Sequence, residues 1–203
     1  MGVEASYQAI PDPCDLLTAA RENLAIAEAL LFLKQYARPE TLFQESPEDR
    51  FVARELKQLL VQFPDLLKEH FYAGGRNFDA IIYLLSAHRR EANFENDPSM
   101  IYKAVLGSEL LHPEAAASQG RPIRFCPAPV VREAAAYLDS VSPEDLREHL
   151  DPKAMYAAAV YKSQFGFNNP EEYFADLLDE FHGMRDLYLL AAENGRAMIV
   201  SID

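Results

Sequence analysis

The chain has 203 residues, 49% hydrophobic and 25% charged, and its 19 Lys and Arg against 32 Asp and Glu give a formal net charge of −13. The hydrophobic fraction is too high for a disordered chain, and the negative charge argues against nucleic acid and anionic membrane surfaces, which are bound through basic patches. This length suits one domain, which we expect to span residues 1–203.

Proline after a short polar residue marks the expected helix starts. The side chain of an Asp, Ser or Asn at the N-cap accepts a hydrogen bond from the first turn, and proline at N1 loses no needed donor. The pattern occurs at Asp12-Pro13, Ser46-Pro47, Asp97-Pro98, Ser142-Pro143, Asp151-Pro152 and Asn169-Pro170. It predicts helices that begin near residues 13, 47, 98, 143, 152 and 170.

In chain order, the N-terminal elements are a strand over 3–9, which alternates apolar and polar side chains, and a helix with an apolar stripe from Leu17 to Leu31. A second helix over 47–63 meets Pro64, after which we expect one or two further turns to about Tyr72. A short apolar helix follows over 78–87. The next helix begins at 98 and continues to Leu106, where Gly107 ends it.

In the second half, residues 123–126 form a short strand candidate and Val130 to Leu138 a helix. After the short helices at 143 and 152, the last helix carries an apolar stripe from Phe174 to Ala192 and ends at Asn194-Gly195. Residues 197–202 are a clear strand. Residues 38–46, 88–97 and 112–122 are the expected longer loops.

The terminal strands most simply pair in one sheet, and strands and helices do not alternate as in a doubly wound fold. We therefore predict an α+β fold: a predominantly helical single domain with one small sheet that includes the N- and C-terminal strands. Two widely spaced cysteines give no disulfide framework, and no signal peptide or 18-residue apolar stretch is present, so we expect a soluble, cytoplasmic protein.

No common catalytic or cofactor motif is present. The chain has no Gly-rich phosphate loop and no nucleophile elbow, and none of its five histidines pairs with another ligand at metal-binding spacing. Cys14, in the expected first turn of a helix, could have a lowered thiol pKa, although a structural role is the simpler interpretation. We accordingly assign no catalytic, cofactor-binding or metal-binding residue.

Two charged clusters are candidate binding surfaces. The first is an acidic face of the last helix, and the second is the basic run after the helix over 78–87, together with a later arginine. Their residues are Glu171, Glu172, Asp176, Asp179 and Glu180 for the acidic face, and His88, Arg89, Arg90 and Arg124 for an anion or small-molecule site. The simpler alternatives are a solvated helix face for the acidic cluster and compensation of the helix dipole at a C-terminus for the basic run.

A set of ordered segments resembles one known family. The segments are the Met1-Gly2 start, Phe78 to Leu85, Ala104 to Gly107, Arg121 to Phe125, Pro129 to Val131, Met155 with Tyr161, and Phe181 to Ile202. Their order is similar to that of the YfbM-like family, a bacterial domain family of unknown function, and the resemblance implies a compact α+β domain with no established activity. Family members tend to carry a Trp and histidines where this chain has Phe78, Asp79 and Ile82.

Two functions remain open. The first is a non-enzymatic binding module, resembling an inhibitor or immunity protein, whose acidic surface engages a basic protein. The alternative is an enzyme or small-molecule-binding protein with a site assembled from distant polar residues. Tyr7, Tyr83, Tyr102, Arg124 and the basic run at 88–90 are the residues that such a site would draw on.

Overall fold

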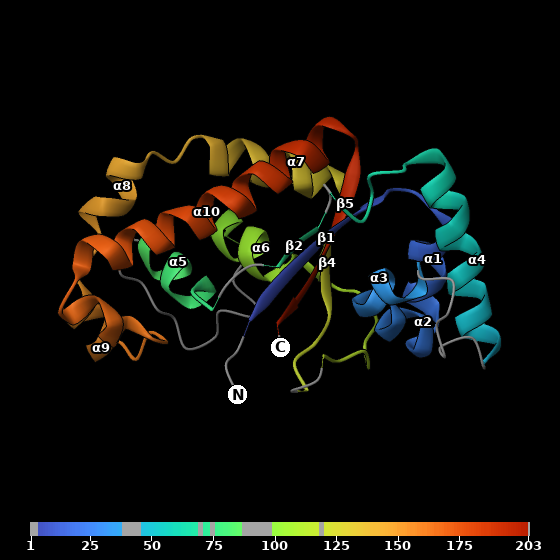
Figure 1. The fold of residues 1–203 in the computed structure, drawn as a ribbon, viewed down its shortest axis with the longest axis horizontal. Coiled ribbons are helices and arrows are strands. Elements are labelled where there is room, and N and C mark those ends of the chain that lie inside the picture. Colours follow the sequence, from blue (N-terminus) through green and yellow to red (C-terminus); the bar gives the residue numbers. More distant parts are fainter. Residues whose placement is uncertain are drawn as a thin grey trace.

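A five-stranded antiparallel sheet lies at the centre of the part of the chain described by the computed structural model, which is residues 4–37, 46–68, 71–73, 76–86, 99–117 and 120–202. The strand order is β2-β1-β5-β4-β3. The strands are β1 (Ala5–Pro11), β2 (Phe71–Ala73), β3 (Glu109–Leu110), β4 (Arg124–Cys126) and β5 (Arg196–Ile202). Helices cover both faces of this sheet (Figure 1).

The two terminal strands form the longest pairing in the sheet. Their register runs from Ala5 opposite Ile202 to Pro11 opposite Arg196. Successive side chains of a strand point to opposite faces. Tyr7 and Ala9 of β1 therefore belong to one core and Ile10 to the other. The predicted α+β fold, with a small sheet that includes the N- and C-terminal strands, is confirmed.

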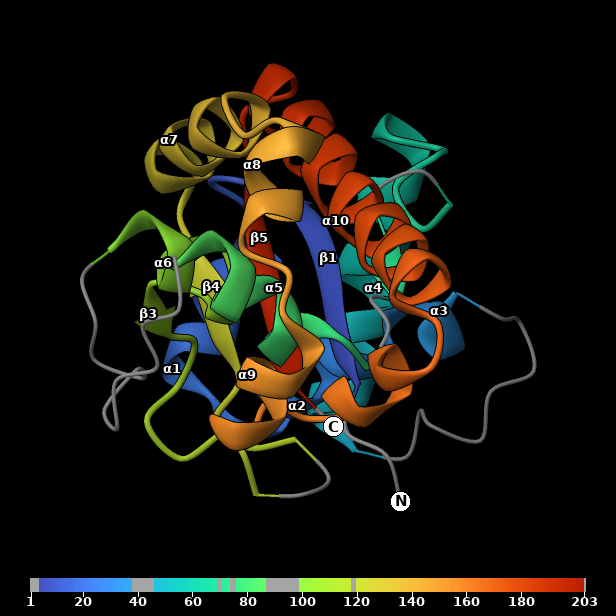
Figure 2. The same cartoon turned by 90° about the vertical axis from the view of Figure 1, so that its left-hand side faces the viewer.

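The part of the chain that follows β2 covers the face that carries Tyr7. Its elements are α5 (Phe78–Leu85), α6 (Met100–Leu106), α7 (Ala128–Asp139), α8 (Pro143–Glu148), α9 (Pro152–Ala157), the 3₁₀ helix η3 (Ser163–Phe167) and α10 (Pro170–Glu193). Helices α7 and α10 pack side by side over the sheet (Figure 2). Leu177, Phe181, Met184, Leu187 and Tyr188 form the buried stripe of α10, as its periodicity predicts.

The first half of the chain covers the opposite face. Its elements are α1 (Asp15–Glu22), α2 (Leu24–Ala29), the 3₁₀ helix η1 (Leu30–Phe32), α3 (Leu33–Tyr36) and α4 (Pro47–Gln62). Leu16, Leu30, Leu33 and Leu56 pack here against Ile10 and Ile199 of the sheet. The terminal strands are thus buried between two helical layers.

Four of the six helix starts predicted from proline are confirmed. Helices α4, α8, α9 and α10 begin at Pro47, Pro143, Pro152 and Pro170, and in each case the preceding side chain accepts a hydrogen bond from the first turn. The other two helices begin two residues later than predicted, at Asp15 and Met100, after the N-caps Cys14 and Ser99. Residues 97 and 98 lie outside the described residues.

Two predicted helical segments are wrong. The stripe from Leu17 to Leu31 is interrupted at Asn23, because its side chain caps α2 while its backbone is extended. Residues 71–73 form strand β2 rather than a continuation of the second helix, because they pair with Ser6 to Gln8 at the edge of the sheet. Within the described ranges, no helix is long and apolar enough to cross a membrane.

Candidate functional site

The acidic residues predicted as a partner-facing surface lie in two different environments on α10. Glu171, Glu172, Asp176 and Asp179 are exposed, whereas Glu180 is half-buried. Glu171 forms an ion pair with Arg147, and Glu172 accepts a hydrogen bond from Asn169 (2.6 Å) at the start of the helix. Asp176 and Asp179 form no ion pair with any described residue, so the exposed, uncompensated part of the acidic run is its middle.

Glu180 joins α10 to the start of α5. Its carboxylate accepts hydrogen bonds from the Asn77 backbone N–H (3.2 Å) and from Asn77 Nδ2 (2.6 Å). Burial raises the pKa of Glu180, and the hydrogen bonds from Asn77 oppose that effect only in part. The shielding of this carboxyl was not visible in the sequence, where its spacing placed it off the apolar stripe.

A buried tyrosine completes the group of polar side chains around Glu180. The Tyr173 hydroxyl is buried without a hydrogen-bond partner among the described residues, and burial together with the charges of Glu180 and Asp79 raises its pKa to about 12. Asp79 accepts a hydrogen bond from the Tyr161 backbone N–H (2.9 Å). The group ties α5, α10 and the segment after α9 together, which is a structural role. No group of metal-ligating side chains occurs among the described residues.

The residues proposed for an anion or small-molecule site do not come together. His88, Arg89 and Arg90 lie outside the described residues. The Arg124 guanidinium donates to the carbonyls of Gly107 (3.0 Å) and Ser108 (3.4 Å), where it holds the turn between α6 and β3. Among the tyrosines, Tyr7 donates to the carbonyl of Val105, and Tyr83 and Tyr102 are buried in the core.

An exposed aromatic patch that the sequence did not reveal lies beside the acidic start of α10. It consists of Tyr156 on α9 and of Phe165 and Phe167 on η3, whose residues are 58%, 62% and 42% exposed. The rings of Tyr156 and Phe167 meet edge to face, with their centroids 5.3 Å apart. Large aromatic side chains on a surface are the usual anchors of protein–protein contacts. We refer to these three residues as the aromatic patch.

Gly166 explains why both of its aromatic neighbours point outward. It is buried, and an added Cβ would lie 2.6 Å from Tyr173 Cδ1 and 2.7 Å from Pro152 Cγ. The 3₁₀ helix therefore packs its glycine against α9 and α10, and Phe165 and Phe167 are left on the outer side. The motif Phe165-Gly166-Phe167 was the one sequence signal that could have indicated this patch.

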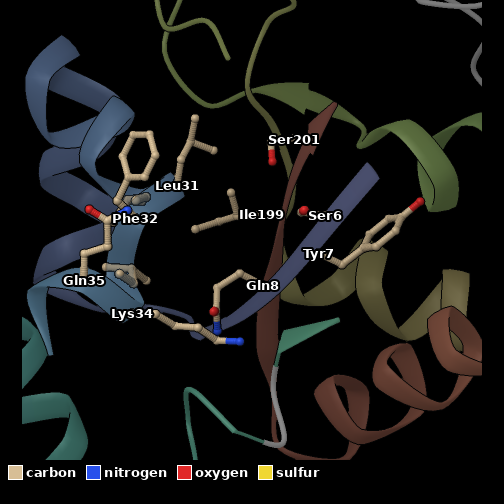
Figure 3. Close-up of a pocket in the computed structure, with 11 residues that line it drawn as sticks. Ser6, Tyr7, Gln8, Leu31, Phe32, Lys34, Gln35, Ile199 and Ser201 are labelled. Carbon is tan, nitrogen blue, oxygen red and sulfur yellow. The ribbon is translucent and has the colours of Figure 1, made fainter. Parts of the chain in front are cut away.

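A pocket of about 140 Å³ lies on the other face of the sheet, beneath η1 and α3. Its floor is made by Ser6 and Gln8 of β1 and by Ile199 and Ser201 of β5, and its wall by residues 30–35. Figure 3 shows these floor side chains on the side of α3, while the ring of Tyr7 extends away toward the opposite core. Lys34 extends from α3 in the direction of Gln8 (Figure 3).

A second pocket, of about 280 Å³, lies between α1 and α4 and includes Cys14. The Cys14 side chain caps α1 by accepting a hydrogen bond from the Leu17 N–H (3.4 Å). Burial raises the pKa of its thiol, which speaks against the alternative of a lowered thiol pKa at this helix start. A capping role fits the structural alternative.

A match to a family model identifies the family of this chain. Residues 40–201 match the model described as "Domain of unknown function (DUF1877)". The chain belongs to the DUF1877 family. No curated protein matches it. Membership of this DUF1877 family of unknown function agrees with the expectation from the YfbM-like resemblance.

A solved structure shares the fold of this DUF1877 chain. It is the crystal structure of YfbM from Escherichia coli, a protein of unknown function, with a TM-score of 0.57 and 12% sequence identity over 98% of this chain and 99% of that one. At this identity the likeness concerns the fold alone. The three departures from the YfbM-like pattern are structural in this chain. Phe78 and Ile82 are buried in the core, and Asp79 accepts the hydrogen bond from Tyr161.

Proposed function

We propose that this DUF1877 chain is a non-enzymatic binding module for a basic protein, and that the aromatic patch and the acidic residues of α10 form its interface. The observation that carries the proposal is the exposure of three aromatic residues on α9 and η3, next in the chain to the exposed carboxylates at the start of α10.

Aromatic side chains supply contact area at a low entropic cost. Tyr and Phe have two side-chain torsions, so ordering them on binding costs less than ordering long aliphatic chains. The packing of Gly166 against Tyr173 and Pro152 fixes the backbone between Phe165 and Phe167 before any partner arrives. The patch is therefore preorganised, which favours affinity.

The charge around the patch selects a basic partner. Asp176 and Asp179 contribute uncompensated negative charge on α10, the helix that follows the patch in the chain. The chain as a whole carries a formal net charge of −13. Lys162 lies in the patch region, with its ammonium 5.7 Å from the centroids of Tyr161 and Phe165, and its charge is offset by the nearby Glu180. Complementary charge speeds association and disfavours acidic partners.

The test is capture followed by a quantitative measurement. The immobilised chain is exposed at low salt to lysate of the organism that encodes it, and proteins eluted by salt are identified by mass spectrometry. The most enriched protein is then purified and titrated calorimetrically into the wild-type chain and its variants. We expect a basic protein whose affinity falls about tenfold or more with Phe165→Ser, because hot-spot anchors contribute on this scale.

Matched controls separate the interface from general surface effects. Asp176→Lys is expected to weaken binding and to change its salt dependence, whereas Glu22→Lys, an equal charge reversal on α1, changes the affinity by less than about twofold. Val61→Ser removes an apolar side chain that is 77% exposed on α4, and it is expected to have no effect. The proposal fails if no protein is retained at low salt, or if the patch variants bind like the wild type.

A further inference from the structure

The pocket beneath α3 has a polar floor at one end of an otherwise apolar sheet face. On this face the core contains Ile10, Ala197 and Ile199. The same face carries Ser6 and Gln8 nearer the start of β1 and Ser201 nearer the end of β5, and these three side chains line the pocket. Gln8 and Ser201 are each only 6% exposed. Buried polar side chains are costly unless they find a hydrogen-bond partner, so the position of Ser201 at the pocket requires an explanation.

The two serine hydroxyls at the pocket floor are available to hydrogen-bond a ligand. Ser6 and Ser201 are directly opposite each other in the β1–β5 register, where the Cβ atoms of such pairs lie about 4.5–5.5 Å apart. Neither hydroxyl is hydrogen-bonded to any described residue. Gln8 donates through Nε2 to the carbonyls of Ala9 (2.8 Å) and Leu66 (3.4 Å), which holds its amide at the pocket.

The charge of the described pocket lining differs in sign from that of the chain as a whole. Among the eleven described residues that line the pocket, the charged one is Lys34, and none is acidic, although acidic residues outnumber basic ones by 32 to 19 in the sequence. Apart from Gln35, the rest of the wall is apolar and includes Leu30, Leu31 and Leu33. A ligand suited to this lining carries a negative charge and a short apolar part.

We propose that the pocket beneath α3 binds a small aliphatic carboxylate. The carboxylate pairs with Lys34 and accepts hydrogen bonds from the hydroxyls of Ser6 and Ser201, and the aliphatic part packs against the leucines of η1 and α3. The pocket volume of about 140 Å³ sets the size. A cavity of about 150 Å³ accommodates benzene, a molecule of about six non-hydrogen atoms, and butyrate is of that size.

The probe for this site is sodium butyrate, titrated into ¹⁵N-labelled protein at constant ionic strength. We expect saturable shifts of the amide signals of Ser6, Gln8, Lys34, Ile199 and Ser201, with a Kd of about 1 mM because so small a ligand makes few contacts. Butyramide and butylammonium have the same length but lack the negative charge. They are expected to bind about fivefold more weakly or not at all.

Two variants assign the contacts. Lys34→Gln is expected to weaken butyrate binding about fivefold, and Ser201→Ala by a similar factor, through the lost ion pair and hydrogen bond. Lys57→Gln is the matched control, since Lys57 is an exposed lysine on α4 outside the pocket, and it is expected to leave the affinity unchanged. The proposal is overturned if butyrate gives no saturable shifts, if butyramide or butylammonium binds equally well, or if Lys34→Gln binds like the wild type.

Discussion

The hydroxyl of Tyr188 on α10 donates a hydrogen bond of 2.7 Å to the carbonyl of Ala104 on α6, a residue 84 positions earlier in the chain. Tyr7 of β1 donates in the same way to the next carbonyl, that of Val105, at 3.0 Å. Helix α6 ends at Leu106, so both carbonyls belong to its last turn, where no backbone N–H of the helix can reach them. Strand β1 and helix α10 therefore cap α6 jointly from inside the core.

Tyr188→Phe is expected to lower the free energy of unfolding by about 1–2 kcal/mol, because it leaves the buried carbonyl of Ala104 without its donor. Urea denaturation followed by circular dichroism measures the change. Tyr137→Phe is the matched control, since Tyr137 on α7 is half-buried and its hydroxyl forms no hydrogen bond with a described residue. Equal losses for the two variants would contradict the capping role of Tyr188.

The fold could be predicted where a local signal is strong. Proline at N1 located four helices, because the N-cap hydrogen bond and the fixed φ act within a few residues. The edge strands β2 and β3 were missed, since three and two residues are too few to display an alternating pattern. Asn23 was missed as a helix boundary because its apolar neighbours continue the helical spacing on both sides.

The candidate sites were less predictable, because the tertiary structure decides which side chains are exposed and which residues distant in the sequence come together. The aromatic residues at positions 156, 165 and 167 resemble core residues in the sequence, and only the packing of Gly166 shows that they point outward. The pocket beneath α3 combines residues from both ends of the chain with residues 30–35, so no local motif marks it. Conversely, Arg124 and Tyr7 drew attention as polar residues, but their polar atoms bind the backbone of the protein itself.

A second prediction concerns the contact between α3 and the capping box of α4. The Asp49 carboxylate accepts hydrogen bonds from the Ser46 backbone and side chain, and also from the Tyr36 hydroxyl at 2.6 Å. These bonds lower the pKa of Asp49. Tyr36→Phe is expected to cost about 1 kcal/mol in the wild-type chain and close to nothing in the Asp49→Ala background, which a double-mutant cycle in urea measures.

The capping box at the start of α8, formed by Ser142 and Asp145, serves as a control for the role of Asp49. There, among the described residues, Asp145 accepts only from Ser142, so Asp145→Ala is expected to destabilise the protein less than Asp49→Ala does. If Tyr36→Phe cost the same with and without Asp49, the hydroxyl would not be coupled to this carboxylate. In that case the link between α3 and α4 would rest on apolar packing alone.

A third prediction follows from the half-buried Glu180. Because burial raises its pKa, the folded state binds its proton more tightly than the unfolded state does. This carboxyl therefore contributes a stability that falls as the pH rises from its ordinary pKa, about 4.3, through the raised value. Glu180→Gln removes the ionisation, so the difference in unfolding free energy between wild type and variant is expected to shift in favour of the variant over that interval.

Asn77 provides the second variant for this titration. Its hydrogen bonds lower the pKa of Glu180, so Asn77→Ala is expected to raise that pKa further and to extend the pH-dependent interval upward. Urea denaturation at a series of pH values measures both effects. A pH-independent difference between wild type and Glu180→Gln would show that the folded and unfolded states bind this proton equally, contrary to the burial seen here.

The last prediction concerns Arg196, a residue that is 4% exposed at the start of β5. Its guanidinium lies 4.9 Å from the centroid of the Phe63 ring. Within the described part of the chain, its buried Nη1 has no hydrogen-bond partner and the side chain forms no ion pair. Burial lowers the pKa of this side chain. A buried charge without a partner loses its hydration and gains only the attraction of the ring.

Arg196→Met is therefore expected to raise the free energy of unfolding by about 1 kcal/mol, because methionine retains packing against Phe63 and removes the desolvated charge. Thermal and urea denaturation measure the change. Arg196→Ala loses the packing as well and is expected to destabilise the protein, whereas Arg21→Met, at an exposed position over the Phe125 ring, changes stability little. A clear loss of stability in Arg196→Met would instead indicate that the guanidinium has an acceptor in solution, such as a bound anion.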